Sequence, residues 1–182
     1  MTMTFLLASA RANGNSEQLA RHAATSLGDD LEQRWLPLRD YPLPAFEDKR
    51  HAGRYDKLHG NAKILAEATL AAQHLVFVTP VYWYSVPTPL KLYLDHWSHW
   101  MRVESLKFKE KMSSMTLWVV AASAGPAAEA EPMLESLRLC GKYLDMKWGG
   151  HVLGNGSKPG DVLNDSDALK RAAHLFQTDV AG

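Results

Sequence analysis

The chain has 182 residues, and 46% of them are hydrophobic. Such a length and composition predict a single domain over residues 1–182 and exclude an intrinsically disordered chain. Lysine plus arginine and aspartate plus glutamate number 20 each, so the chain offers no basic surface for nucleic acid.

Apolar runs and helical stripes alternate along the whole chain. The predicted strands, in chain order, cover residues 4–8, 31–38, 75–78, 115–122 and 148–153. The predicted helices cover residues 19–27, 58–72, 90–101 and 133–144, with a last helix that starts near Asn164 or Ser166 and reaches Phe176. Between the second strand and the second helix, Pro42 and Pro44 forbid regular helix and predict a long ordered surface loop.

Strands that are apolar on both faces and separated by helices predict a parallel sheet with helices on both sides. Only crossover helices can join parallel neighbours while covering both faces. We therefore expect a three-layer α/β domain with five strands in the common order 2-1-3-4-5. That order places a ligand crevice at the carboxyl ends of strands one and three.

The loop after the first strand, Ser9 to Ser16, has the composition of an anion site. It runs directly into a helix, whose first amides are unpaired donors at the positive end of the helix dipole. Ser9, Asn15 and Ser16 carry polar hydrogens, and Arg11 supplies a guanidinium for phosphate oxygens. The loop lacks the Walker A lysine and the dinucleotide glycine pattern, which favours a terminal monophosphate. The same residue types also occur at ordinary helix starts.

The loop after the third strand, residues 79–89, places three consecutive aromatic residues between prolines. Tyr82, Trp83 and Tyr84 cannot all point into one core, and they suit the face and edges of a flat ring system. A loop that packs on the core or contacts a second subunit is the alternative interpretation.

These two loops, together with the Leu90-Lys91-x-Tyr93-Leu94-Asp95 segment, resemble the NAD(P)H-dependent FMN reductase and quinone reductase families of the flavodoxin-like superfamily. The likeness spans nearly the whole chain and includes the Pro-Leu-Pro loop between Leu38 and Asp48. It implies a flavodoxin-like fold with FMN as cofactor and NADH or NADPH as co-substrate. The compact cysteine motif of iron-sulfur relatives is absent.

The resemblance also implies which residues bind FMN. Carried over by motif, the phosphate contacts are Ser9, Arg11, Asn15 and Ser16, and the ring contacts are Pro80, Val81, Tyr82, Trp83 and Tyr84. A third loop, with Ser123, Ala124 and Gly125, would close the other edge of the ring. Relatives often carry two glycines in this loop, and Ala124 takes the place of one.

The expected activity is hydride transfer from NAD(P)H through FMN to a quinone, flavin or similar small acceptor, by a ping-pong mechanism. No side chain is assigned as catalytic, because the flavin carries the chemistry. The alternatives are a flavodoxin-type electron carrier and a flavin-binding regulatory protein for a membrane transporter. The zero net charge argues against the carrier, because carriers are usually strongly acidic. The acceptor and the NADH or NADPH preference stay open.

The remaining chemistry-bearing residues favour ordinary roles. His96 and His99 lack a metal-binding spacing, and Cys140, the only cysteine, lies on an apolar helical stripe, so we expect no metal site. The bulky helix with Trp97, Trp100 and Met101 predicts a homodimer, or a tetramer built from one.

Location and processing follow from what is missing. A single cysteine suits a reducing cytoplasm, and no apolar run reaches the roughly 20 residues of a membrane span. The apolar stretch near the N-terminus lacks the basic flank of a signal peptide. We therefore expect a cytoplasmic, unprocessed chain without membrane insertion.

Overall fold

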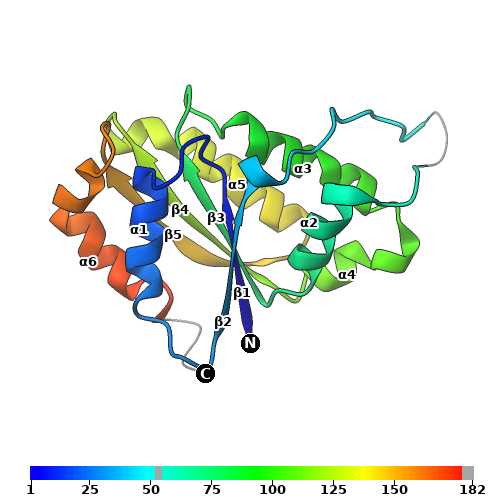
Figure 1. The fold of residues 1–182 in the computed structure, drawn as a ribbon, viewed down its shortest axis with the longest axis horizontal. Coiled ribbons are helices and arrows are strands. Elements are labelled where there is room, and N and C mark those ends of the chain that lie inside the picture. The colour runs from blue at the N-terminus through cyan, green and yellow to red at the C-terminus, as the bar shows by residue number, and fades with distance from the viewer. Residues whose placement is uncertain (52–54, 178–182) are drawn as a thin grey trace.

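The computed structural model describes residues 1–51 and 55–177, which form a central sheet between two layers of helices (Figure 1). The strands are β1 (Thr2–Leu7), β2 (Glu32–Pro37), β3 (His74–Pro80), β4 (Thr116–Ser123) and β5 (Lys147–Asn155). All neighbouring strands are parallel, in the order β2-β1-β3-β4-β5. The predicted strand order is confirmed.

Helices cover both faces of the sheet, as crossover connections between parallel strands require. The helices are α1 (Asn15–Ala24), α2 (Gly60–Leu70), α3 (Thr88–Trp100), α4 (Phe108–Met112), α5 (Glu131–Tyr143) and α6 (Ser166–His174). Short 3-10 turns lie at Leu38–Asp40, Glu104–Leu106, Ala127–Ala130 and Asp161–Asn164. The five-residue α4 and these turns were not predicted, because so short a segment shows no helical period.

Two hydrophobic clusters hold the layers together. One lies between the sheet and α1 with α6, where Phe5, Trp118 and Phe176 are buried. The other lies between the sheet and α2, α3, α4 and α5, and it includes Tyr93 and Trp100. Figure 1 shows α1 and α6 on one side of the strands and α3 and α5 on the other. Because β1, β3 and β4 are buried on both faces, their sequences are apolar runs without alternation.

Gly149 in β5 shows how closely the layers pack. A Cβ at this position would lie 2.5 Å from two ring carbons of the buried Trp118. The β4–β5 register also shifts between Leu117 and Trp118, so the edge strand bends around this indole. The indole Nε1 donates to His74 Nδ1 at 3.3 Å, which satisfies its only polar group.

Candidate functional site

The loops after β1, β3 and β4 meet at the carboxyl edge of the sheet. In the ladder Leu7 pairs with Val78, and Pro80 pairs with Ala122, so these three strands end side by side. Two further bonds continue the pairing into the loops: Ala8 N–H donates to Val78 O at 2.8 Å, and Val81 N–H donates to Ala122 O at 2.9 Å. The three segments predicted to hold one ligand are therefore neighbours (Figure 1).

The first loop presents free donors at the start of α1. Gly14 is the N-cap and provides no side-chain cap, so the first-turn amides of this ten-residue helix have no intrahelical partner. Ser16, the second residue of the helix, is only 2% exposed. Ser9 is also buried, and a Cβ on Gly14 would lie 3.1 Å from its hydroxyl oxygen.

Arg11 lies at the exposed end of this loop. Its guanidinium forms no ion pair with the described residues, while its backbone N–H donates to Ser9 Oγ at 3.1 Å. A buried hydroxyl, uncapped amides and an unpaired guanidinium form a donor set that fits a phosphate group.

The side chain of Asn15 contacts the loop after β5. Its side-chain amide donates to Lys158 O and accepts from Gly160 N–H, each at 2.9 Å. The amide nitrogen carries a second hydrogen, and the backbone N–H is uncapped, so the phosphate contact of Asn15 stays a prediction. The side chain also ties the loop after β5 to the phosphate loop. Gly156 makes the approach possible, because a Cβ there would lie 2.8 Å from the Asn15 amide nitrogen.

The second loop forms a tight hairpin turn with two aromatic residues at its tip. Tyr82 and Ser85 exchange N–H to O bonds of 2.9 and 3.0 Å, and the central residues Trp83 and Tyr84 have φ of 50° and 61°. Positive φ at both central positions defines a type I′ turn, for which Asn-Gly is the usual sequence. Trp83 is 92% exposed and Tyr84 is 56% exposed.

This turn keeps its aromatic side chains out of the core at some cost in backbone strain. Bulky residues rarely adopt the left-handed region, and strain of this kind gathers at functional sites. The turn is anchored at one end by the Val81–Ala122 bond and at the other by the buried Pro87. Pro80 and Val81 are half-buried at its base. The exposed rings can therefore contact a flat ligand or another chain.

The third loop is held by the side chain of Ser123, a predicted ring contact, and by that of Asn155, which was not predicted. Ser123 Oγ accepts from Gly125 N–H at 3.2 Å, and Asn155 Nδ2 donates to Gly125 O at 3.4 Å. Neither Ala124 nor Gly125 is among the described residues with positive φ. The alanine that replaces a family glycine therefore needs no unusual backbone conformation.

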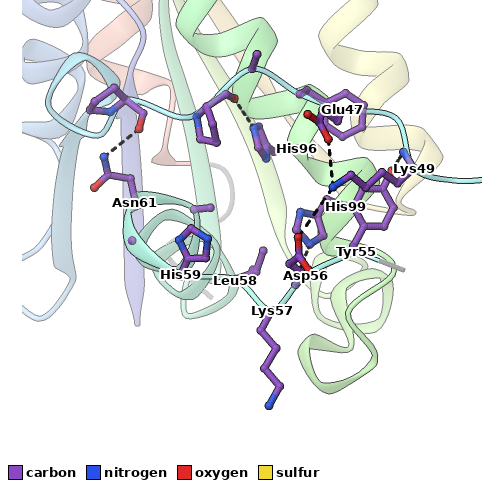
Figure 2. A pocket seen from close by; sticks show the side chains of 16 residues that line it. Glu47, Lys49, Tyr55, Asp56, Lys57, Leu58, His59, Asn61, His96 and His99 are labelled. Carbon is purple, nitrogen blue, oxygen red and sulfur yellow. Dashed lines mark hydrogen bonds and ion pairs between the residues drawn. The ribbon is translucent and has the colours of Figure 1, made fainter. Parts of the chain in front are cut away.

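One hollow lies away from these three loops, beneath the long loop between β2 and α2 (Figure 2). His96 and His99 of α3 line it, and their Nε2 atoms contact Pro44 O and Asp56 O, each at 2.9 Å. Tyr55 stacks on His99 with ring centroids 4.5 Å apart. Both imidazoles thus hold the loop on α3, and burial lowers the pKa of His99. None of the predicted FMN contacts lines this hollow.

An apolar groove of about 570 Å³ runs between α3 and α5. Leu94, Trp97, Met101, Leu139 and Tyr143 line it, and Leu139 is 50% exposed. Cys140 also lines the groove, where burial raises the pKa of its thiol and keeps it protonated. No three His, Cys, Asp or Glu side chains gather as a metal site within residues 1–51 and 55–177. Among the helices of the same ranges, none has the length and hydropathy to cross a membrane.

A five-stranded parallel sheet in this order, with helices on both faces, defines the flavodoxin-like class of α/β proteins. The model of the NADPH-dependent FMN reductase family matches residues 1–155. The chain is also 33% identical over 170 residues to YwqN of Bacillus subtilis, named as an NAD(P)H-dependent FMN-containing oxidoreductase, with 92% of each chain covered. The chain belongs to the NADPH-dependent FMN reductase family.

Solved structures agree on the fold. A Bacillus subtilis protein solved as a Trp repressor binding protein is 28% identical with a TM-score of 0.76, covering 96% of this chain and 97% of that one. An FMN-dependent NADH-azoreductase from Bacillus anthracis in complex with FMN is 14% identical with a TM-score of 0.71, covering 99% and 100%. The predicted flavodoxin-like fold and the predicted class, an FMN-dependent NAD(P)H oxidoreductase, are confirmed.

Proposed function

We propose that this enzyme passes hydride from NAD(P)H through FMN to a quinone, flavin or similar small acceptor, in two half-reactions that use one site in turn. Bound FMN supplies the chemistry, because its ring accepts a hydride and then returns the electrons to an acceptor. The side chains bind, orient and exclude water. The observation that carries the proposal is the uncapped start of α1 at Asn15 and Ser16, on the same sheet edge as the aromatic turn at Tyr82–Ser85.

In this proposal Ser9, Arg11, Asn15 and Ser16 hold the FMN phosphate. Pro80, Val81, Tyr82, Trp83 and Tyr84 line the ring from one side, and Ser123, Ala124 and Gly125 line its other edge. The Val81–Ala122 bond supports this arrangement, because it fixes the two ring loops next to each other.

Replacing Arg11 and Ser16 with alanine tests the phosphate site. Both residues lie in a surface loop or at a helix start, so the domain should still fold. The double variant should bind FMN at least tenfold more weakly, the loss expected when charge-assisted bonds worth about 1.5–3 kcal/mol are removed. Its riboflavin affinity should stay the same, because riboflavin lacks the phosphate. Unchanged FMN affinity would show that the phosphate binds elsewhere.

Initial rates test the order in which substrates bind and products leave. Parallel double-reciprocal lines at several acceptor concentrations indicate that NAD(P)+ leaves before the acceptor binds. Intersecting lines would contradict the shared site. Oxidation of NAD(P)H by the purified protein alone would favour an enzyme over an electron carrier. An electron carrier would need a protein partner for this reaction.

We also propose a homodimer in the cytoplasm, with the α3–α5 groove as the subunit contact. The groove is apolar and bears exposed Leu139 and Tyr143, as interface centres do. Leu139→Glu should shift the sedimentation coefficient toward that of a monomer. Leu163→Glu is the matched control, because Leu163 is 52% exposed but lies in the 3-10 turn after β5. A chain that sediments as a monomer at micromolar concentration would contradict the dimer.

A further inference from the structure

Asn13, the residue before the N-cap Gly14 of α1, is held at both of its backbone polar atoms. Its N–H donates to Glu17 Oε2 at 2.9 Å, and its carbonyl accepts from Gln18 Nε2 at 2.7 Å. Its φ is 52°, so the two side chains fix a left-handed conformation that the chain adopts only at some cost. The phosphate loop is therefore shaped by α1 itself, without a ligand.

Glu17 is an unexpected residue at this place. It is only 5% exposed, and it lies in the first turn of the helix whose start is the proposed phosphate site. A glutamate at this place interacts favourably with the helix dipole. A buried negative charge so close to the site also repels a phosphate. The carboxylate of Glu17 supplies the acceptor that Asn13 N–H needs, but its negative charge would weaken phosphate binding.

Arg21 removes that conflict. Its Nε and Nη2 atoms donate to Glu17 Oε1 at 3.1 and 2.8 Å, while the other carboxylate oxygen stays on Asn13. The guanidinium lies 4.3 Å from the ring centroid of Trp35, and Trp35 stacks on Phe5 with centroids 3.9 Å apart. Arg21 is thus held in place by the β1–β2 side of the sheet and stays beside the carboxylate.

We propose that Glu17 and Arg21 are positioning residues for the FMN phosphate: Glu17 holds the loop in its binding shape, and Arg21 cancels the charge that this costs. The inference rests on the proposed phosphate site at Ser9–Ser16. Arg11, which has no ion pair of its own among the described residues, then faces the phosphate with its charge intact. A role in helix stability alone would make the same contacts but would not distinguish FMN from riboflavin.

Three variants separate charge from shape. Arg21→Met keeps an unbranched side chain over Trp35 and removes the charge. Glu17→Gln keeps an oxygen that can accept from Asn13 N–H and removes the negative charge. The third variant combines both changes. Lys63→Met is the control, because Lys63 forms an i,i+4 pair with Glu67 at 3.7 Å on α2 instead of α1.

The probes are FMN and riboflavin, titrated into apoprotein and followed by flavin fluorescence. Arg21→Met should weaken FMN binding about tenfold or more, the effect of one uncompensated charge near a phosphate at an effective dielectric constant of about 20. Its riboflavin affinity should not change. Glu17→Gln should bind FMN as tightly as the wild type or more tightly. The double variant should return to the wild-type affinity, and all differences should shrink at high salt.

Two results would overturn the positioning role of Glu17 and Arg21 while leaving the phosphate site in place. If Arg21→Met weakened the binding of FMN and of riboflavin equally, the Glu17–Arg21 contact would be purely structural. A double variant that still bound FMN weakly would show the same. Thermal melts of each apoprotein identify any variant that fails to fold. If a variant with the Arg21 change does not fold, Glu17→Gln decides alone, and FMN binding weaker than that of the wild type would contradict the proposal. A wild-type protein that binds riboflavin as tightly as FMN would remove the phosphate site itself, and this inference with it.

Discussion

Replacing Trp83 and Tyr84 with Asn and Gly should make the protein more stable and its flavin site weaker. The native turn places two bulky residues at φ of 50° and 61°, where Asn-Gly is the preferred pair. Trp83 is 92% exposed, so its removal takes almost no buried apolar surface from the fold. The same rings are proposed to line the isoalloxazine, so their removal takes contact area from the ligand.

The expected gain in the free energy of unfolding follows from the backbone conformation of the turn. Left-handed conformations cost about 1–2 kcal/mol for each non-glycine residue. Asn tolerates this region, and Gly adopts it freely but loses about 0.5–1 kcal/mol of chain entropy on folding. The net gain is about 1 kcal/mol, which corresponds to a rise in Tm of roughly 2–4 °C for a domain of this size. Losing aromatic stacking should weaken flavin binding by about tenfold, or roughly 1.4 kcal/mol.

Thermal unfolding of apoprotein measures the first effect, and titration with riboflavin measures the second without the phosphate. Asp145→Gly is the matched control: Asp145 has φ of 57° in the turn between α5 and β5, far along the chain from the ring loop. It should raise Tm without changing flavin affinity. A double variant at Trp83 and Tyr84 that is less stable than wild type would refute the strain argument, and unchanged riboflavin affinity would refute the ring contact.

Three further changes probe the fold around the site. Gly149→Ala should lower the free energy of unfolding by about 2 kcal/mol, because its Cβ would overlap the Trp118 ring at 2.5 Å; an unchanged denaturant midpoint would contradict this packing. Tyr93→Phe removes the buried 2.6 Å bond to Thr69 Oγ1 and should cost about 1 kcal/mol in denaturant unfolding while FMN affinity stays constant; a change in FMN affinity would mean that this core residue reaches the site. Burial lowers the pKa of His99 below its ordinary value of 6.5, so the unfolded chain takes up its proton first as the pH falls. Stability should therefore be fully present above pH 6.5 and decrease below it, with a smaller decrease in His99→Gln; identical Tm profiles against pH for the two proteins would contradict the burial argument.

The strand order was predictable because its physical cause is visible in the sequence. Runs such as Leu75–Val78 are apolar on both faces, which only a parallel sheet covered by helices explains. The loops that follow β1 and β3 were equally visible, because their polar and aromatic residues stand directly after such runs. A parallel sheet then brings them to one edge.

The missed features depend on contacts between distant parts of the chain. The side chain of Asn15 bonds the Lys158–Gly160 segment, more than 140 residues away, and no local pattern in the sequence predicts that contact. Trp83 and Tyr84 carry no signal for a type I′ turn, so the strained hairpin could not be foreseen. Glu17 stands three residues after Gly14, the spacing of a capping glutamate, and this was the available signal for its role.

The central claim is that this family member binds FMN at the sheet edge and reduces it with NAD(P)H. The most direct test is the visible absorbance spectrum of the purified protein, reconstituted with FMN and then mixed anaerobically with NADH or NADPH. We expect the wild type to keep its flavin band through gel filtration and to lose it when the nicotinamide reduces the flavin. The variant with alanine in place of Arg11 and Ser16 should lose its flavin during gel filtration. A wild-type protein that retains no flavin, or whose bound flavin stays oxidised with both nicotinamides, would contradict the central claim.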